Sequence, residues 1–393
     1  MSVPTMAKTP ANAWFIFSTC AVAIFFVWLE STGMPAMVPT FQRVWPEYSS
    51  NYIAWILNSY SIVFALLLIP MGWLTDRVGS QRMLTIGLMA YGVTSIACAL
   101  SPDLPTLIMA RITQGAAAAC LTPAALAWAL QNLPLHQQAR AMYLWAAVGG
   151  IAAAAGPILA NIAHNTAWPW IFFIHVVGSF IALFFIQKLK PSTVDAAKQI
   201  TTPPQWKTLT QGNFIYLQIS TLAFGAAFVF ILLNVQQLFI HTFQFSHTQA
   251  ALHLTLAIAF CVITSFGLAF SRIGKKRKYL TVTGAILTAC VGWLFILSEG
   301  NAFSIALIIP LLLAGLGLGM ALPNFSSLSI HAVPINLKGV ANAINQSARL
   351  LGSALGIAIS QYVQNPESVL GITLTACCLL SIAFLMCTDK NIQ

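Results

Sequence analysis

The sequence predicts an all-α integral membrane protein in which twelve transmembrane helices form two related bundles of six. Three observations support this fold class. The chain has 393 residues, of which 58% are hydrophobic and only 7% charged, whereas about a quarter of the residues in soluble domains are charged. Twelve apolar stretches are long enough to span a bilayer, which takes about 20 residues. A basic loop after the second stretch also recurs in the second half of the chain.

The expected spans follow one another with mostly short connections. They are residues 13–38, 52–74, 83–101, 105–130, 140–162, 168–187, 213–240, 249–271, 279–298, 303–328, 339–362 and 368–387. The longest connection is polar and contains Pro191, Pro203 and Pro204. We therefore expect an N-terminal six-helix bundle over 1–190, a cytoplasmic linker over 191–212 and a C-terminal six-helix bundle over 213–393.

The basic residues predict the orientation of these spans. With a cytoplasmic N-terminus, 15 of the 18 Lys and Arg residues face the cytoplasm: Lys8, Arg77, Arg82, Arg140, Lys188, Lys190, Lys198, Lys207, Arg272, Lys275, Lys276, Arg277, Lys278, Lys338 and Lys390. Arg43 lies on the other side, and Arg111 and Arg349 lie inside spans. Such a bias is typical of cytoplasmic loops, and it places the net charge of +10 beside anionic lipid headgroups. We expect both termini in the cytoplasm, a bacterial inner membrane as the location, and no nucleic-acid partner.

An internal repeat links the two halves. Residues 72–82 read GWLTDRVGSQR and residues 267–277 read GLAFSRIGKKR, so that four Gly and Arg positions correspond at an offset of 195. Leu133-Pro134 and Val333-Pro334 correspond at an offset of 200. Two homologous halves related by an axis along the membrane normal would produce this pattern.

Two opposite charges are expected at similar depth in the bilayer. Glu30 lies eight residues inside Val38, about 12 Å along a helix, and Arg111 lies six residues inside Pro105, about 9 Å. A charge in hydrocarbon costs about 2.5–3.5 kcal/mol even on insertion scales, so both residues are candidates for proton coupling. Burial favours the neutral carboxyl group and a nearby cation favours the charged one, and this competition can let Glu30 exchange a proton. The alternative is a structural ion pair that fastens two helices together.

Several motifs resemble those of the major facilitator superfamily, and within it the drug:proton antiporters. GWLTDRVGSQR is similar to the cytoplasmic signature G-x-L-x-D-R-x-G-x-x-R, with Ser80 at a position that is often basic. MARITQGAAAACLTP (109–123) resembles the fourth-helix motif, and Gly156-Pro157 the fifth-helix antiporter motif, in which Ala152, Ala160 and Asn161 replace glycines. WLESTGMPAMVP (28–39), WPWIFFIH (168–175) and GVANAINQSARLLGSALG (339–356) are similar to segments of the fourteen-helix exporters, although only twelve spans are expected here.

The resemblance implies roles for two groups of residues. The loop residues Gly72, Asp76, Arg77, Gly79 and Arg82 would form a cytoplasmic gate, in which Asp76 accepts hydrogen bonds from helix N-termini or Arg side chains; the alternative is loop charge that only sets topology. The second copy has Ser271 in place of Asp76. Gly149, Gly156 and Pro157 would form the antiporter-type helix motif, with close helix packing as the alternative.

Polar residues inside spans are candidates for a substrate cavity. Asn342, Asn345, Gln346 and Arg349 share one face of a helix and either line a cavity or bond neighbouring helices. Further candidates are Gln114, Asn58, Trp145, Asn234 and Gln237. His175 and His253 can titrate, but hydrogen-bonded structural roles are favoured for them.

The predicted function is secondary active transport, namely proton-coupled export of small amphipathic molecules or drugs by alternating access. The alternative within transport is proton-coupled movement of a specific metabolite or siderophore. A membrane enzyme or a transporter-like sensor is disfavoured, because the chain shows neither a clustered catalytic set nor a long polar segment outside the central linker. No ATP-binding loop, cofactor fingerprint or metal spacing is present, so we expect no cofactor. The expected partners are a small-molecule substrate, protons and lipid, and the resemblance implies a monomer.

Overall fold

The computed structural model describes most of the chain. The described residues are 12–165, 167–189, 206–241, 243–245, 247–271, 277–297, 304–334, 337–362 and 366–388. Every regular element within these ranges is a helix. Of the expected linker, residues 191–205 lie outside the described ranges, and its described end contains the short helix η1 (Trp206–Thr210).

The helices follow the expected spans closely. In the first half they are α1 (Ala13–Val44), α2 (Ser50–Ile53), α3 (Trp55–Val78), α4 (Ser80–Ala99), α5 (Leu104–Gln131), α6 (Leu135–Asn165) and α7 (Trp170–Lys188). In the second half they are α8 (Gly212–His241), α9 (His247–Phe270), α10 (Arg277–Leu297), α11 (Ser304–His331), α12 (Lys338–Tyr362) and α13 (Pro366–Met386). All but α2 have at least 19 residues, so the described part contains twelve long helices.

Ten of the described helices are long and apolar enough to cross a membrane. The two exceptions among the long helices are α12 and α13. The apolar part of α13 is the shorter segment Gly371–Met386, and α12 carries the polar stripe that includes Asn345 and Arg349. A helix with such a stripe is less apolar on average, although its remaining faces suit a packed membrane bundle.

The first helix is longer than expected. It continues from the predicted end at residue 38 to Val44, with Pro35 and Pro39 in its interior. A proline removes one hydrogen bond from a helix, but the last turns of α1 are held by packing. Phe41 and Trp45 are buried, and their rings lie 6.0 and 5.3 Å from the ring of Trp168. Burial of these rings offsets the lost bond.

Helix ends follow local chemistry. The side chain of Asp103 accepts a hydrogen bond of 2.8 Å from the backbone nitrogen of Thr106 and so caps the N-terminus of α5. Hydrogen bonding by the side chain and the backbone nitrogen of Thr106 lowers the pKa of Asp103, which lies in the connection between α4 and α5. The boundary between α3 and α4 is Gly79, whose φ of 100° is a backbone conformation that suits glycine.

The chain divides into two compact units. One comprises Met1–Ala141, Ala152–Pro204 and Ile335–Ala343, and the other Met142–Ile151, Gln205–Pro334 and Ile344–Gln393. Segments of α6 and α12 are thus grouped with the unit of the other half of the sequence. The expected bundle boundaries at 1–190 and 213–393 stay a prediction.

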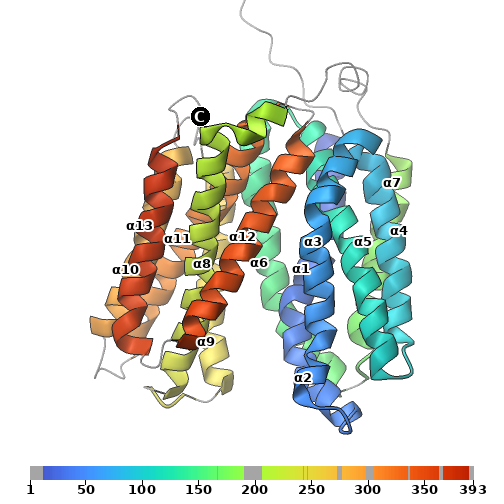
Figure 1. The fold of residues 1–393 in the computed structure, drawn as a ribbon, viewed down its shortest axis with the longest axis horizontal. Coiled ribbons are helices and arrows are strands. Elements are labelled where there is room, and N and C mark those ends of the chain that lie inside the picture. The colour runs from blue at the N-terminus through green and yellow to red at the C-terminus, as the bar shows by residue number, and fades with distance from the viewer. Residues whose placement is uncertain are drawn as a thin grey trace, which may run out of the picture. The chain divides into compact units, whose positions relative to one another are not determined.

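Within the first unit, α5 packs against α1, α3 and α4, and α7 packs against α1 and α4. Figure 1 shows α3, α5 and α4 side by side. Within the second unit, α11 packs against α8, α9 and α10, and α13 packs against α8 and α10. The central position of α5 matters for function, because this helix carries Arg111.

Candidate functional site

The buried charges of α1 and α5 meet in the first unit. Glu30 and Arg111 form an ion pair between Oε1 and Nη1, and each side chain is only 1% exposed. The structure therefore brings together the two residues that the sequence singled out for proton coupling. A buried ion pair is stable only if its remaining hydrogen-bonding atoms also find partners.

The guanidinium group of Arg111 has such partners. Its Nε donates to the backbone carbonyl of Ile56 at 2.9 Å, and Nη1 donates to Oε1 of Gln114 at 2.7 Å. Its planar face lies 4.3 Å from the ring centre of Tyr60. These contacts use the planar fork of an arginine, which a lysine cannot reproduce.

The carboxyl group of Glu30 has a second partner on α4. The hydroxyl group of Tyr91 donates to Oε2 of Glu30 at 2.5 Å, and Tyr91 is 1% exposed. One turn later, the hydroxyl of Ser95 donates to the backbone carbonyl of Tyr91 at 2.6 Å and accepts from Nε2 of Gln114 at 2.9 Å. Glu30, Tyr91, Ser95, Arg111 and Gln114 thus form one buried network, which we call the carboxylate network.

The expected gate residue Asp76 binds the beginning of α12. Its Oδ1 accepts from the backbone nitrogen of Gly339 at 3.0 Å and its Oδ2 from that of Val340 at 2.9 Å. The first amide groups of a helix have no partner in the helix and carry a partial positive charge. A carboxylate that binds two of them closes that helix end. We call this contact the Asp76 latch.

Other gate residues have different surroundings. Gly72 permits the close approach of α3 to α12, since a Cβ there would overlap the Ala343 side chain and the backbone of Gly339. The guanidinium group of Arg77 stacks on Trp73 at 4.0 Å from the ring centre, and Arg82 is exposed. The donors that Asp76 binds are thus the backbone amides at the N-terminus of α12.

The glycine motif of α6 contacts α1. A Cβ on Gly156 would overlap the side chain of Thr32 and the backbone of Gly33 and Leu29. This contact brings α6 to the segment of α1 that directly follows Glu30. Gly149 is half-buried, and the side chain of Pro157 lies outside the described part of the structure.

The polar stripe of α12 is largely engaged in helix contacts. Nδ2 of Asn345 donates to Thr221 and Ser329 at 2.9 Å each, and its Oδ1 accepts from Ser326 at 3.1 Å. This geometry matches the helix-bonding alternative for Asn345. Asn342 is also buried, whereas Gln346 and Arg349 are half-buried.

The remaining cavity candidates have different surroundings. Nδ2 of Asn234 donates to the carbonyl of Phe230 in its own helix at 2.8 Å. Asn58 is exposed and Trp145 is buried. The side chain of Gln237 lies outside the described part. Gln114 is the candidate that belongs to the carboxylate network.

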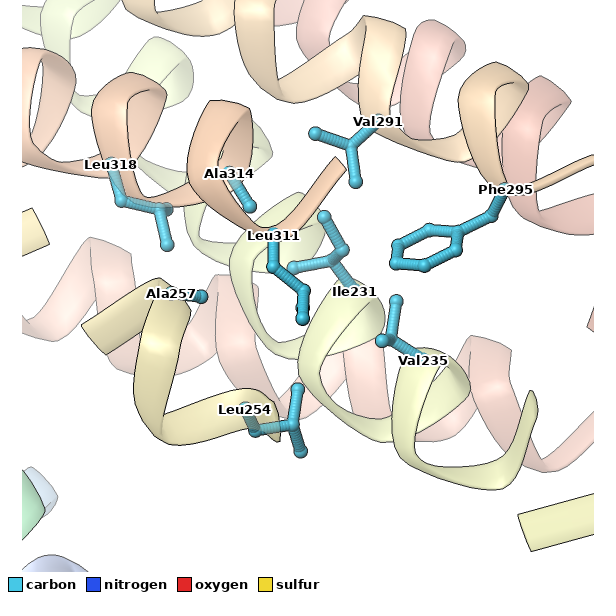
Figure 2. Close-up of a pocket in the computed structure, with 9 residues that line it drawn as sticks. All are labelled: Ile231, Val235, Leu254, Ala257, Val291, Phe295, Leu311, Ala314 and Leu318. Carbon is cyan, nitrogen blue, oxygen red and sulfur yellow. The ribbon is translucent and has the colours of Figure 1, made fainter. Parts of the chain in front are cut away.

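The cavity in Figure 2 belongs to the second unit and is apolar throughout. Its lining consists of Ile231, Val235, Leu254, Ala257, Val291, Phe295, Leu311, Ala314 and Leu318. The volume is about 10 Å³, which is at the lower limit for one water molecule. We interpret it as a small packing defect in the core rather than as a ligand site.

Comparison with known proteins identifies the family. The sequence matches the family model of the Major Facilitator Superfamily over residues 13–357. The chain belongs to this superfamily. The tetracenomycin C resistance and export protein of Streptomyces glaucescens is 24% identical over 418 residues, covering 90% of this chain and 77% of that one. The multidrug export protein EmrB of Escherichia coli is 32% identical over 187 residues, covering 47% of this chain and 36% of EmrB, so this chain spans about a third of EmrB's length.

The fold comparison agrees with the family assignment. A crystal structure of the Major Facilitator Superfamily transporter FucP in the outward conformation has a TM-score of 0.78 to this chain. It is 13% identical and covers 96% of this chain and 99% of that one. At this identity the similarity shows the fold alone. The predicted fold class, twelve helices in the major facilitator fold, is confirmed, and the protein is a multi-pass membrane transporter of this superfamily.

Sequence reasoning missed one residue of this site. Tyr91 was not singled out, although it is the only aromatic residue between Ser80 and Ala99. For His175, hydrogen-bonded structural roles were favoured; the backbone carbonyl groups of Phe26 and Ile171 lie near its ring, although neither ring nitrogen makes a hydrogen bond of normal geometry. Its ring centre lies 5.8 Å from that of Tyr91. The segment WPWIFFIH (168–175) resembles the exporter motif W-R-W-I-F-x-I-N, and the His at its last position, where that motif has Asn, was the available signal.

Replacing Gly156 with alanine is expected to destabilise the protein by about 1–3 kcal/mol, because the added methyl group overpacks the contact between α6 and α1. The measurement is the thermal unfolding midpoint of the purified protein in detergent. Gly267→Ala is the matched control, since a Cβ at Gly267 meets no atom within 4 Å and alanine favours a helix. Equal midpoints for the two variants would contradict the expectation.

Proposed function

We propose that this transporter exports small amphipathic molecules in exchange for protons. The observation that carries the proposal is the ion pair of Glu30 and Arg111, buried at 1% exposure on two different helices. A carboxyl group in this position can exist in two forms that interact very differently with Arg111. Protonation removes the charge of Glu30 and hence the ion pair.

Such a change can bias two conformations of the transporter. A proton shifts the equilibrium between two states only if it binds them with different affinity. In the state described here, Arg111 and Tyr91 both stabilise the ionised carboxyl group, which disfavours its protonation. A state in which α1 and α5 separate would lose the ion pair and would favour the protonated form.

The substrate class rests on the relatives and on composition. The printed names of two relatives refer to tetracenomycin C export and to multidrug export. The chain has 25 Phe and 11 Trp residues and few charges, which suits apolar or amphipathic ligands. Polar residues at half-buried positions, such as Gln346 and Arg349, are candidates for substrate contact.

The remaining architecture follows the same proposal. The Asp76 latch would stabilise the state in which the cytoplasmic ends are closed. Both termini would lie in the cytoplasm of a bacterium, the segment 191–212 would link bundles 1–190 and 213–393, and the protein would act as a monomer. Gly149, Gly156 and Pro157 would provide the close helix packing that exchange of the two states requires.

The proposal is tested by the direction in which a substrate moves under an imposed pH gradient. A deletion strain and an expressing strain are first compared for growth on a panel of amphipathic dyes and antibiotics, and the compound with the largest protection is chosen. In proteoliposomes, we expect this compound to move in the direction opposite to the proton flow that the imposed gradient drives. We expect its transport to stop when a protonophore collapses the gradient. Movement in the same direction as the protons would favour the uptake alternative, and the lack of protection against any compound would contradict export of such molecules.

A further inference from the structure

His175 is a buried histidine beside the carboxylate network. It lies on α7 with an exposed fraction of 0%. Neither ring nitrogen makes a hydrogen bond of normal geometry, although the backbone carbonyl groups of Phe26 and Ile171 lie nearby. Unsatisfied polar atoms in such a place are costly, so a partner in another state of the protein is expected.

The chemistry of the imidazole ring narrows the choice of partner. A neutral imidazole has one nitrogen that donates and one that accepts. The two carbonyl groups can only accept, so they can serve the N–H group of His175. The other nitrogen requires a donor.

Tyr91 is a donor whose ring packs directly against His175. The described groups around His175 include the Phe26 and Tyr91 rings, at 6.4 and 5.8 Å between ring centres, and the charge of Arg111. Arg111 is engaged by Glu30, Ile56 and Gln114. The hydroxyl group of Tyr91 has a single proton, which it now gives to Glu30.

The bond from Tyr91 to Glu30 depends on the charge of Glu30. A hydrogen bond to an ionised acceptor is about twice as strong as one between neutral groups. Once Glu30 carries a proton, this advantage disappears and the Tyr91 hydroxyl can turn to another acceptor. His175 provides an acceptor on the adjacent helix that is otherwise unsatisfied.

We propose that Tyr91 is a hydrogen-bond switch, which donates to Glu30 while that carboxyl group is ionised and to His175 once Glu30 is protonated. The inference rests on the proposed proton coupling and names the residue that stabilises its protonated state. The proton that moves comes from the aqueous phase and stays on Glu30. Tyr91 keeps its own proton, and His175 stays neutral throughout. The titratable neighbours are Glu30 on α1, Tyr60 on α3, Tyr91 and Cys98 on α4, and Arg111 on α5.

The switch predicts that His175 stabilises the neutral form of Glu30. The experiment is a pH titration of the purified full-length protein in nanodiscs, followed by the infrared band of protonated carboxyl groups. Glu30→Gln identifies the contribution of Glu30 to this band. In His175→Phe, the midpoint of Glu30 protonation is expected to move to lower pH by about half to one unit. His175→Asn, whose amide oxygen can accept the Tyr91 proton, should restore most of this shift.

A double-variant cycle separates the switch from a simple packing effect. In a Tyr91→Phe background, His175→Phe should cause no further shift, because the hydroxyl group through which His175 acts is gone. The same shift in both backgrounds, or no shift in the single variant, would overturn the switch. If Glu30 does not titrate in the wild-type protein at all, the proposed proton coupling itself fails, which is a distinct result. Equal thermal midpoints of the His175→Asn and wild-type proteins verify that folding is intact.

Discussion

Replacing Glu30 with glutamine is expected to abolish transport driven by a pH gradient while the protein still reaches the membrane. Glutamine has the shape of a protonated glutamate and cannot release a proton. Like a protonated carboxyl group, its neutral amide binds the Tyr91 hydroxyl less strongly than a carboxylate does. Arg111 keeps its bonds to Ile56 and Gln114, so the variant resembles the protonated state that the proposed cycle passes through.

The measurement distinguishes loss of proton coupling from loss of substrate movement. In proteoliposomes, uphill transport by Glu30→Gln should fall to the level of empty vesicles, whereas equilibration of the same compound down its own gradient should persist. Asp103→Asn is the matched control, because Asp103 is an exposed acid that caps α5 and asparagine caps helices as well as aspartate. This variant should transport normally. Unchanged gradient-driven transport by Glu30→Gln would refute the role of Glu30 and leave the structural ion pair as its explanation.

Replacing Asp76 with alanine is expected to release the first turn of α12. The change removes two hydrogen bonds to a charged acceptor, at 3.0 and 2.9 Å, and each such bond contributes about 1.5–3 kcal/mol. The amides of Gly339 and Val340 should therefore exchange with solvent deuterium about 10- to 100-fold faster, since each 1.4 kcal/mol is a factor of ten. Hydrogen exchange followed by mass spectrometry of peptides across residues 337–345 measures this effect.

A matched variant shows whether the effect is specific to the latch. Asp103→Ala also removes a carboxylate from a helix N-terminus, but that carboxylate binds Thr106 three residues away, whereas the partners of Asp76 lie 263 and 264 residues away in sequence. Only Asp76→Ala should both expose α12 and slow transport. If exchange in α12 is unchanged, the latch does not hold this helix end in solution.

Much of the fold was predictable because lipid restricts the possible structures. Spanning segments must satisfy every backbone group internally, so an apolar stretch of sufficient length indicates a helix. The expected span 339–362 and the observed helix Lys338–Tyr362 differ by one residue. The predicted end of α1 was wrong by six residues. The two prolines near this end favour termination of the helix, whereas the packing of Phe41 and Trp45 that extends it depends on residues distant in the sequence.

Only the charged residues of the candidate site could be predicted from the sequence. Glu30 and Arg111 stand out because charges in apolar segments are rare. Tyr91 and His175 cannot be recognised in this way, since Tyr and His also occur as ordinary packing residues. Their importance depends on the rotation of α4 and α7 toward Glu30.

The sequence by itself determined that the chain is a membrane-embedded helical transporter with one buried acid and one buried base in its first half. These properties follow from composition and from spacing along the chain, which the cost of placing polar groups in lipid makes informative. The partners of each group came only from the folded arrangement. Asp76 binds two backbone amides of a distant helix and Tyr91 binds Glu30 across helices, and such bonds depend on how helices are rotated and packed, which no local pattern of residues encodes.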